Sequence, residues 1–167
     1  MPKIIENVRQ QLLTEAKRQI TEVGYKSTTI RSVATACKVA VGTVYNYFKS
    51  KDILIASFIL EDWLLCLSSI GEYPKEDKKD YLSFIHSSLN GFVGKYTKLF
   101  SDRDAAQVFG IAFSERHRQL RAQLAELIRP ITDGDFSAEY IAESMLTWTM
   151  AGRSFAEIYP LLPEQIK

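Results

Sequence analysis

The chain has 167 residues, of which 46% are hydrophobic and 25% charged, and its formal net charge is +1. This composition is ordinary for a globular protein with a real core, and no stretch approaches the roughly 18 uninterrupted apolar residues of a transmembrane helix. The opening sequence, MPKIIENVRQ, lacks the apolar segment of a secretory signal. We therefore expect a cytoplasmic protein with no membrane partner.

The small net charge hides an asymmetry along the chain. Residues 1–51 carry nine Lys or Arg and three Asp or Glu, a net charge of +6, whereas residues 52–167 have a net charge of −5. A basic amino-terminal third on an acidic remainder is the distribution expected of a DNA-binding head on a body that does not bind DNA.

Apolar spacing predicts a first helix over residues 3–23. Its apolar residues recur at helical intervals, and Gly24 follows them, as a glycine often follows the last turn of a helix. The apolar stripe consists of Ile5, Val8, Leu12, Leu13, Ala16 and Ile20.

Two short helices are predicted next, at about 29–37 and 41–48. Thr28 and Thr29 precede the first, where a hydroxyl can accept an unpaired backbone N–H. A tight turn at 38–40 separates the two helices, and Val44 and Phe48 give the second an inward face. Together they predict a helix-turn-helix, whose second helix fits the major groove of DNA. The inward face of the first helix consists of Ile30, Val33, Ala34 and Cys37.

Four further helical segments are predicted after the motif. They run from Ser50 or Lys51 to about Ile70, over about 76–100, over about 104–129 as one helix or as two broken near Ser114, and over about 137–159. With no alternating strand pattern and no internal repeat, the chain is predicted to be all-α. We assign residues 1–50 to a helix-turn-helix DNA-binding domain and 51–167 to a helical effector-binding and dimerisation domain, joined within the fourth helix.

The string from Gly24 to Lys51 resembles the DNA-binding domain of the tetracycline-repressor (TetR) family. The matching residues are Gly24-Tyr25, Thr28-Thr29-Ile30, Val33-Ala34, Val39, Gly42-Thr43-Val44-Tyr45, Tyr47-Phe48 and Lys51. Lys38 departs from the pattern, because it stands where a glycine usually closes the first helix of the motif. Ala40 also departs, because it stands where a serine or threonine usually caps the recognition helix. Both departures concern the geometry of the turn.

The resemblance implies two sets of DNA contacts. Contacts to phosphates are implied for Thr29, Tyr45, Tyr47 and Lys51. Contacts to base edges are implied for Arg31, Val41, Gly42, Thr43 and Asn46. An arginine suits guanine, an asparagine suits adenine, and a methyl group suits the methyl of thymine. For Tyr45 the alternative is that it packs against the first helix.

The body contains more aromatic residues than a helical core needs, and the resemblance implies that they enclose a cavity for a small hydrophobic effector. The candidate lining residues are Trp63, Phe92, Tyr96, Phe109, Phe113 and Trp148. The resemblance also implies a homodimer, paired through its last two helices, on double-stranded palindromic operator DNA. The implied function is a transcriptional repressor that the effector releases. The alternative is a constitutive dimeric DNA-binding regulator whose body binds a protein partner or no ligand.

Catalytic chemistry has little support in the sequence. His86 and His117 lie on separate predicted helices outside any HExxH spacing, and the chain has no glycine-rich phosphate loop and no GxSxG elbow. Cys37 and Cys66 lie on apolar faces, which favours buried thiols over a disulfide or metal ligands. We therefore expect no enzyme, no metal and no cofactor. A helical enzyme or lipid carrier with a vestigial motif would not need Thr29 or Lys51.

Overall fold

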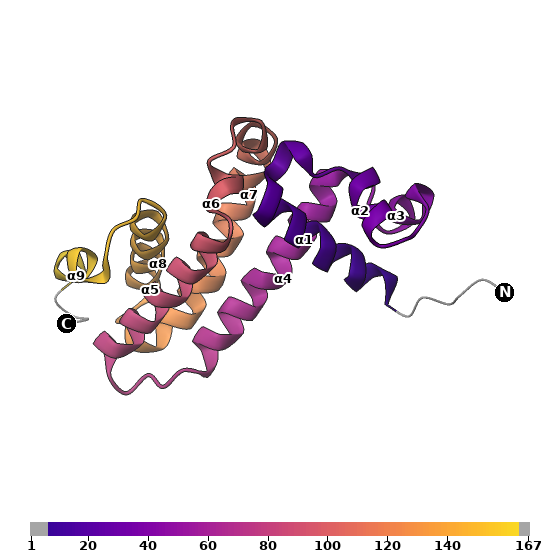
Figure 1. The fold of residues 1–167 in the computed structure, drawn as a ribbon. Coiled ribbons are helices and arrows are strands. Elements are labelled where there is room, and N and C mark those ends of the chain that lie inside the picture. The colour runs from indigo at the N-terminus through magenta and orange to yellow at the C-terminus, as the bar shows by residue number, and fades with distance from the viewer. Residues whose placement is uncertain (1–6, 164–167) are drawn as a thin grey trace. The chain divides into compact units, whose positions relative to one another are not determined.

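The computed structural model describes residues 7–163, and within residues 108–117 it describes the backbone but not the side chains. Every regular element in the described part is a helix, which confirms the all-α prediction (Figure 1). The α-helices are α1 (Val8–Ser27), α2 (Ile30–Ala36), α3 (Val41–Tyr47), α4 (Lys51–Glu72), α5 (Lys78–Lys95), α6 (Thr97–Phe100), α7 (Arg103–Ile128), α8 (Asp135–Met150) and α9 (Phe155–Ile158). Single 3₁₀ turns follow α7 (Arg129–Ile131) and α9 (Tyr159–Leu161).

The helices form two compact units. The amino-terminal unit runs to Asp62 and includes residues 96–110, and the body unit consists of 63–95 and 111–167. Helix α4 therefore contributes to both units, and Asp62 and Trp63 lie on either side of the division. The segment that returns to the amino-terminal unit does so because Tyr96, Leu99 and Ala105 are buried there.

Apolar residues at helical spacing build the core of the amino-terminal unit. Leu12, Ala16 and Ile20 recur every four residues along one face of α1, and none is more than 1% exposed. Val33 of α2 and Val44 of α3 are fully buried, and α2 packs against both α1 and α3. Burial of each of these larger side chains contributes about 1.5–3 kcal/mol to folding.

The core of the body unit lies between α5, α7 and α8. Ile85 and Leu89 of α5, Ile128 of α7 and Met145 of α8 belong to one buried cluster. The Tyr81 hydroxyl donates a hydrogen bond to the Leu127 carbonyl at 2.9 Å, and burial raises the pKa of Tyr81 to about 12. The buried phenol of Tyr81 thus packs at the edge of the apolar core, and its hydroxyl has a hydrogen-bond partner.

Two of the predicted helices are each divided in two. The prediction of one helix over 76–100 is wrong, because Tyr96 has φ −114° and ψ 14° and separates α5 from α6. The predicted helix over 137–159 is also wrong, because α8 ends at Met150 and Gly152 adopts the left-handed conformation with φ 74°. The segment over 104–129, for which one or two helices were expected, is a single helix, α7.

The boundaries near the amino terminus follow the prediction closely. Gly24 has φ 85° and interrupts the helical conformation of α1 as expected, although one more turn follows it to Ser27. The predicted start at residue 3 lies outside the described residues. Helices α2, α3 and α4 begin and end within two residues of the predicted limits.

Helix α4 is unusually apolar for a helix that is only partly buried. An 18-residue window has a mean hydropathy of 1.9, which is enough by length and composition for a membrane span, and 33% of that window is buried. The core helix of a soluble protein passes the same test, so this property is weak evidence for a membrane. No second helix of this kind occurs in the part of the chain that the structure describes.

Gly152 should be a site where alanine destabilises the protein. An added Cβ meets nothing within 4 Å, but φ of 74° disfavours any side chain, so Gly152→Ala should lower the free energy of unfolding by about 1 kcal/mol. Gly91→Ala is the matched control, because Gly91 lies within α5 with equally open space, and it should stabilise by about 0.5–1 kcal/mol. Urea unfolding measures both, and effects of the same sign would contradict this account.

Candidate nucleic-acid interface

Helix α2 begins with a reciprocal cap. The Thr29 hydroxyl accepts the Ser32 N–H at 2.9 Å, and the Ser32 hydroxyl accepts the Thr29 N–H at 2.9 Å. This capping box satisfies two N–H groups at the start of the helix. The exposed Thr29 hydroxyl keeps its own proton, which remains available to a phosphate oxygen, as the predicted role of this residue requires.

The turn between α2 and α3 holds both departures from the family pattern. Lys38 adopts φ 57°, its N–H donates to the Thr35 carbonyl at 3.1 Å, and the Val39 N–H donates to the Ala34 carbonyl at 3.0 Å. These two bonds form a Schellman motif, with a lysine at the position that glycine usually occupies. Ala40 precedes α3 and offers no side-chain cap.

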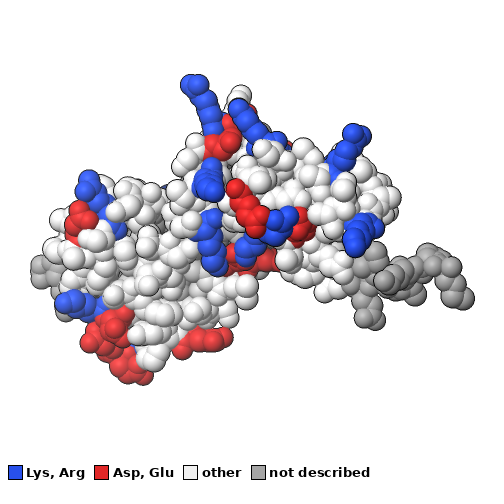
Figure 2. Space-filling view, viewed as in Figure 1, with Lys and Arg blue, Asp and Glu red and all other residues white. Residues whose placement is uncertain are grey.

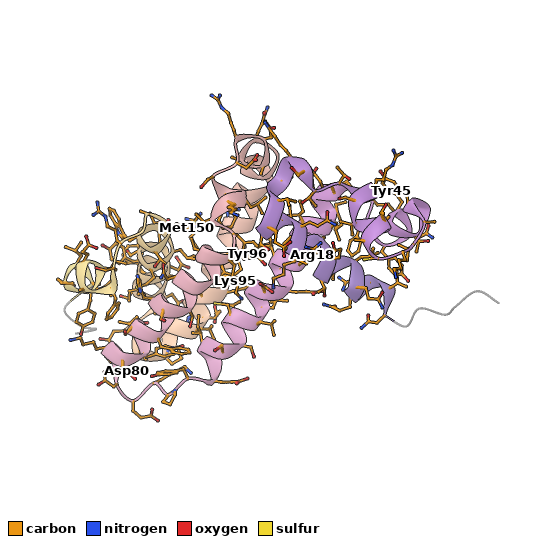
Figure 3. All side chains as sticks on the ribbon, in the orientation of Figure 1. Arg18, Tyr45, Asp80, Lys95, Tyr96 and Met150 are labelled. Atoms are coloured by element: carbon orange, nitrogen blue, oxygen red, sulfur yellow. The ribbon has the colours of Figure 1, made fainter. Side chains whose placement is uncertain are left out.

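Helix α3 buries one face and exposes the other. Val44 is fully buried and Phe48, the next residue on that face, is 2% exposed. The exposed residues are Val41, Gly42, Tyr45, Asn46 and Tyr47, and Thr43 is half-buried. Tyr45, labelled on α3 in Figure 3, is 46% exposed, so much of its side chain can meet another molecule. The structure thus brings the predicted base-contacting residues of α3 onto one short helix.

Basic side chains of α1 and of the helix-turn-helix differ in their partners. Those of α1 are paired with acids: Arg9 with Glu61 at 2.8 Å, Lys17 with Asp62 at 2.7 Å, Arg18 with Glu15 at 2.7 Å and Lys26 with Asp104 at 3.1 Å. Those of the motif, Arg31, Lys38 and Lys49, are exposed and have no ion pair among the described residues. On the face drawn in Figure 2, blue side chains lack red neighbours where Figure 1 places α2 and α3.

Lys38 and Lys49 are the members of this group that the sequence-based assignment of DNA contacts did not include. A signal was present, because the motif contains three lysines and only Lys51 was given a role. Sequence reasoning could not tell which lysines are held by acids, since the partners in α4 and α7 lie far away along the chain.

Lys51 is turned toward its own unit. Its ammonium donates to the Tyr25 carbonyl at 2.9 Å and lies 3.5 Å from the centre of the Tyr25 ring. The Tyr25 hydroxyl donates to Asp52 at 2.7 Å, which completes the link between the end of α1 and the start of α4. Burial lowers the pKa of Lys51. A phosphate contact by this ammonium, which stays a prediction, requires it to exchange the carbonyl for the phosphate.

A buried carboxylate holds α1 to α4. Both oxygens of Asp62, which is 8% exposed, accept hydrogen bonds from Lys17 at 2.7 Å, and one also accepts the Tyr96 hydroxyl at 2.8 Å. The Tyr96 ring, labelled at the start of α6 in Figure 3, stacks on Phe58 at 6.0 Å. Burial and the Asp62 carboxylate raise the pKa of Tyr96, which keeps the phenol protonated as a donor.

The predicted ligand-pocket residues occupy different surroundings. Trp63 is 1% exposed, contacts Phe92 edge to face at 5.3 Å, and donates its indole N–H to Gln123 at 2.9 Å. Tyr96 belongs to the amino-terminal unit instead. The side chains of Phe109 and Phe113 lie outside the described residues.

Trp148 lies at the surface of the body unit and is 44% exposed. It lines a hollow of about 230 Å³ together with Arg153, Glu157, Ile158 and Leu161. Trp63 and Phe92 therefore remain together as candidate pocket residues, whereas Trp148 lines a separate surface feature.

The described residues contain no cluster of three or more His, Cys, Asp or Glu that could hold a metal ion. His86 contacts the Arg153 carbonyl through Nε2 at 2.9 Å and packs near Phe155, which fits a structural role within the body unit. The side chain of His117 lies outside the described residues. Burial raises the pKa of both Cys37 and Cys66, which keeps these thiols protonated.

Comparison with known proteins agrees with this geometry. Residues 12–58 match the family model described as bacterial regulatory proteins, tetR family. The HTH-type transcriptional regulator HbdR of Aromatoleum sp. (strain CIB) is 41% identical over 51 residues, 30% of this chain and 22% of that protein. UidR of Escherichia coli (strain K12), also an HTH-type transcriptional regulator, is 28% identical over 137 residues, 82% of this chain and 64% of that protein. The chain thus spans less than two thirds of each of these relatives.

The fold of the whole chain is shared with solved structures. The fatty acid degradation regulator FadR from Bacillus halodurans superposes with a TM-score of 0.61 at 18% identity, over 95% of this chain and 94% of that one. The fold and the turn between α2 and α3 define a helix-turn-helix protein with a helical body. Within this fold, residues 12–58 match the tetR family of bacterial regulatory proteins, the family that the motif resembles.

Removal of the Tyr96 hydroxyl should test the buried carboxylate. Tyr96→Phe deletes a hydrogen bond to a charged, buried acceptor and should lower the free energy of unfolding by about 1.5–3 kcal/mol. Tyr73→Phe is the matched control, because the Tyr73 hydroxyl also donates to a carboxylate, that of Asp80 at 2.8 Å, but in an exposed position. The control should change stability by less than about 0.5 kcal/mol. Equal losses in urea unfolding would show that the burial of Asp62 adds nothing.

Proposed function

We propose that the chain is a sequence-specific DNA-binding transcriptional regulator that works in the cytoplasm as a homodimer on palindromic operator DNA. The observation that carries this proposal is the helix-turn-helix itself. The exposed face of α3 is accompanied by Arg31, Lys38 and Lys49, which have no ion pair with any residue that the structure describes. Elsewhere in the unit acids neutralise the cations of α1. Positive charge is therefore available where a recognition helix would meet phosphates.

The exposed residues divide by the contacts that their chemistry allows. The Asn46 amide can pair with adenine, and Val41 or the Thr43 methyl can touch a thymine methyl. Arg31 can bind guanine from α2. The hydroxyls of Thr29, Tyr45 and Tyr47 can donate to phosphates, which fix the orientation of the helix without reading the sequence. Gly42 lets the backbone of α3 approach the groove, since an added Cβ at this position would lie in open space.

Dimerisation is supported by an apolar surface on α8. Phe136 is 80% exposed and Tyr140 is 47% exposed, and their spacing of four residues places both on one face of the helix. Met150 is 44% exposed near the end of the same helix. Exposed aromatic side chains in one stripe are typical of a protein interface. We propose that α8 pairs with its counterpart in a second copy and so sets the distance between two recognition helices.

We further propose that a small hydrophobic effector binds in the body unit and releases the protein, as a repressor, from its operator. Trp63 and Phe92 supply aromatic contacts there. The buried Thr149 hydroxyl has no hydrogen-bond partner among the described residues, and it lies one turn beyond Met145 of the core. If the effector binds the DNA-bound and the DNA-free conformations of the protein with different affinities, it must change the affinity of the protein for DNA. A constitutive regulator, with a body that takes a protein partner or no ligand, is the alternative.

Operator binding by two variants tests the DNA-binding role. With roughly six to ten phosphates neutralised per dimer, the affinity of the wild type should fall about a thousandfold or more between 50 and 200 mM salt. Asn46→Ala should relax the preference at one operator position at a cost of about 1–3 kcal/mol. Lys49→Ala should weaken all sequences equally and flatten the salt dependence. Anisotropy titrations on an operator selected from random-sequence DNA, and on its single-base variants, measure all three.

Lys49→Ala also serves as the control for Asn46→Ala, because both change an exposed residue of the motif. A wild type with almost no salt dependence would reject the assigned interface. A uniform loss from Asn46→Ala, with a change of base preference from Lys49→Ala, would reject the assigned orientation of α3.

Thr149→Val tests the body as a ligand site. Valine has nearly the shape of threonine, so removal of an unpaired buried hydroxyl should stabilise the free protein by about 1–2 kcal/mol. The same change should weaken the binding of palmitate, which has an apolar chain and a polar end, as followed by the fluorescence of Trp63 and Trp148, the two tryptophans of the chain. Thr147→Val is the control, since the exposed Thr147 hydroxyl already donates to Glu143 at 2.9 Å. If palmitate binds without changing operator affinity, the constitutive alternative is favoured.

A further inference from the structure

The residue that closes α2 is a lysine in a conformation that favours glycine. Lys38 has φ 57°, and the Schellman motif around it has the usual two hydrogen bonds. The same motif ends α8, where the Gly152 N–H donates to Thr149 and the Arg153 N–H donates to Trp148, both at 2.9 Å. There the left-handed position, with φ 74°, is filled by glycine. Two turns with the same pattern of hydrogen bonds thus have different residues, a lysine and a glycine, in the left-handed position.

Nothing within the described protein compensates Lys38 for this conformation. Its side chain is exposed, and it makes no hydrogen bond, ion pair or ring contact with any described residue. Asparagine and aspartate tolerate the left-handed region because their short side chains bond the local backbone, which a lysine cannot do. Strained residues cluster at functional sites, so a strained residue without a stabilising contact in its own protein is a candidate for contact with another molecule.

The position of Lys38 identifies the kind of partner. It lies three residues before Val41, the first residue of α3, and a recognition helix enters the major groove with its amino-terminal residues against the bases. That groove is about 12 Å wide and flanked by phosphates on both sides. A turn directly before the inserted helix end therefore lies close to a phosphate row. The four-carbon stem and the three donors of a lysine suit a contact with a phosphate at a distance that a shorter residue could not span.

We propose that Lys38 is a sequence-independent DNA phosphate contact, retained at the expense of the stability of the turn. This inference rests on the DNA-binding function proposed above and adds a residue to it. The exposed ammonium neutralises one phosphate in each half-site, as Lys49 of the same motif does. The conformational cost appears in the free protein, whereas the gain appears only when DNA is bound.

Lys38→Gly should therefore move stability and DNA affinity in opposite directions. Relief of the left-handed strain should raise the melting temperature by roughly 2–4 °C for a chain of this size. Loss of one phosphate contact per half-site should reduce the slope of log affinity against log salt by about two per dimer, and lower affinity about tenfold or more at 0.1 M salt. The loss should be equal on a selected operator and on a scrambled 30-base-pair duplex of the same length.

Two further variants isolate the cause. Lys38→Asn removes the charge but tolerates the left-handed conformation, so it should match the glycine variant in DNA binding with a smaller gain in stability. Arg103→Gln is the control for charge alone, because Arg103 is exposed on α7 of the same unit and has no ion pair among the described residues. It should leave the salt slope unchanged.

The outcomes separate this inference from the proposed function. A wild type that shows no salt-dependent binding to either duplex overturns the DNA-binding function, and the role of Lys38 with it. A wild type that binds, with Lys38→Gly and Lys38→Asn at the same affinity and slope, overturns only the role of Lys38. An equal change of slope from Arg103→Gln also overturns it, because the effect would then belong to the net charge of the unit.

Discussion

The amino-terminal unit depends on the buried carboxylate of Asp62. It ties Lys17 of α1 to Tyr96, so a single charged group in α4 fixes two segments that are far apart in the sequence. Without these partners the carboxylate would be a costly buried charge, which makes the three residues mutually dependent. Because α1 packs against α2 and α2 packs against α3, this network helps to fix the position of the motif. The contacts among Lys51, Tyr25 and Asp52 join the carboxyl-terminal end of α1 to the start of α4.

Much of this fold could be predicted from the sequence because most of its helices bury a face at regular spacing. The two errors share one cause. Tyr96 continues the apolar pattern of α5, and Phe155 lies four residues after Ala151, so helical spacing alone does not mark either break. For α8 the signals were local: Gly152 is followed by a capping box of Ser154 and Glu157. Tyr96, the residue at the other break, donates its hydroxyl to Asp62, 34 residues away, and spacing along the sequence does not identify such a partner.

In the candidate site, too, some features depend on residues nearby in the sequence and others on distant residues. The exposed face of α3 follows from the spacing of Val44 and Phe48, and so most of its residues could be predicted, although Thr43 is half-buried. The side-chain partners of the lysines were not, because ion pairs and carbonyl contacts join α1 to α4 and α7. Lys51 shows the difference most clearly: its position in the motif suggested an outward ammonium, but the Tyr25 carbonyl and ring hold it inward.

Charge counting along a sequence therefore misjudges how much positive potential a DNA-binding head presents. The first 51 residues have a net charge of +6, yet Arg9, Lys17 and Lys26 pair with acids that lie beyond that segment. Because each pair contains one positive and one negative charge, its electrostatic potential is largely cancelled at a distance. What remains is concentrated on the helix-turn-helix, where Arg31 of α2 and Lys49, which follows α3, have no ion pair among the described residues. The local arrangement of a few unpaired cations, rather than the total charge, gives this unit its attraction for a polyanion.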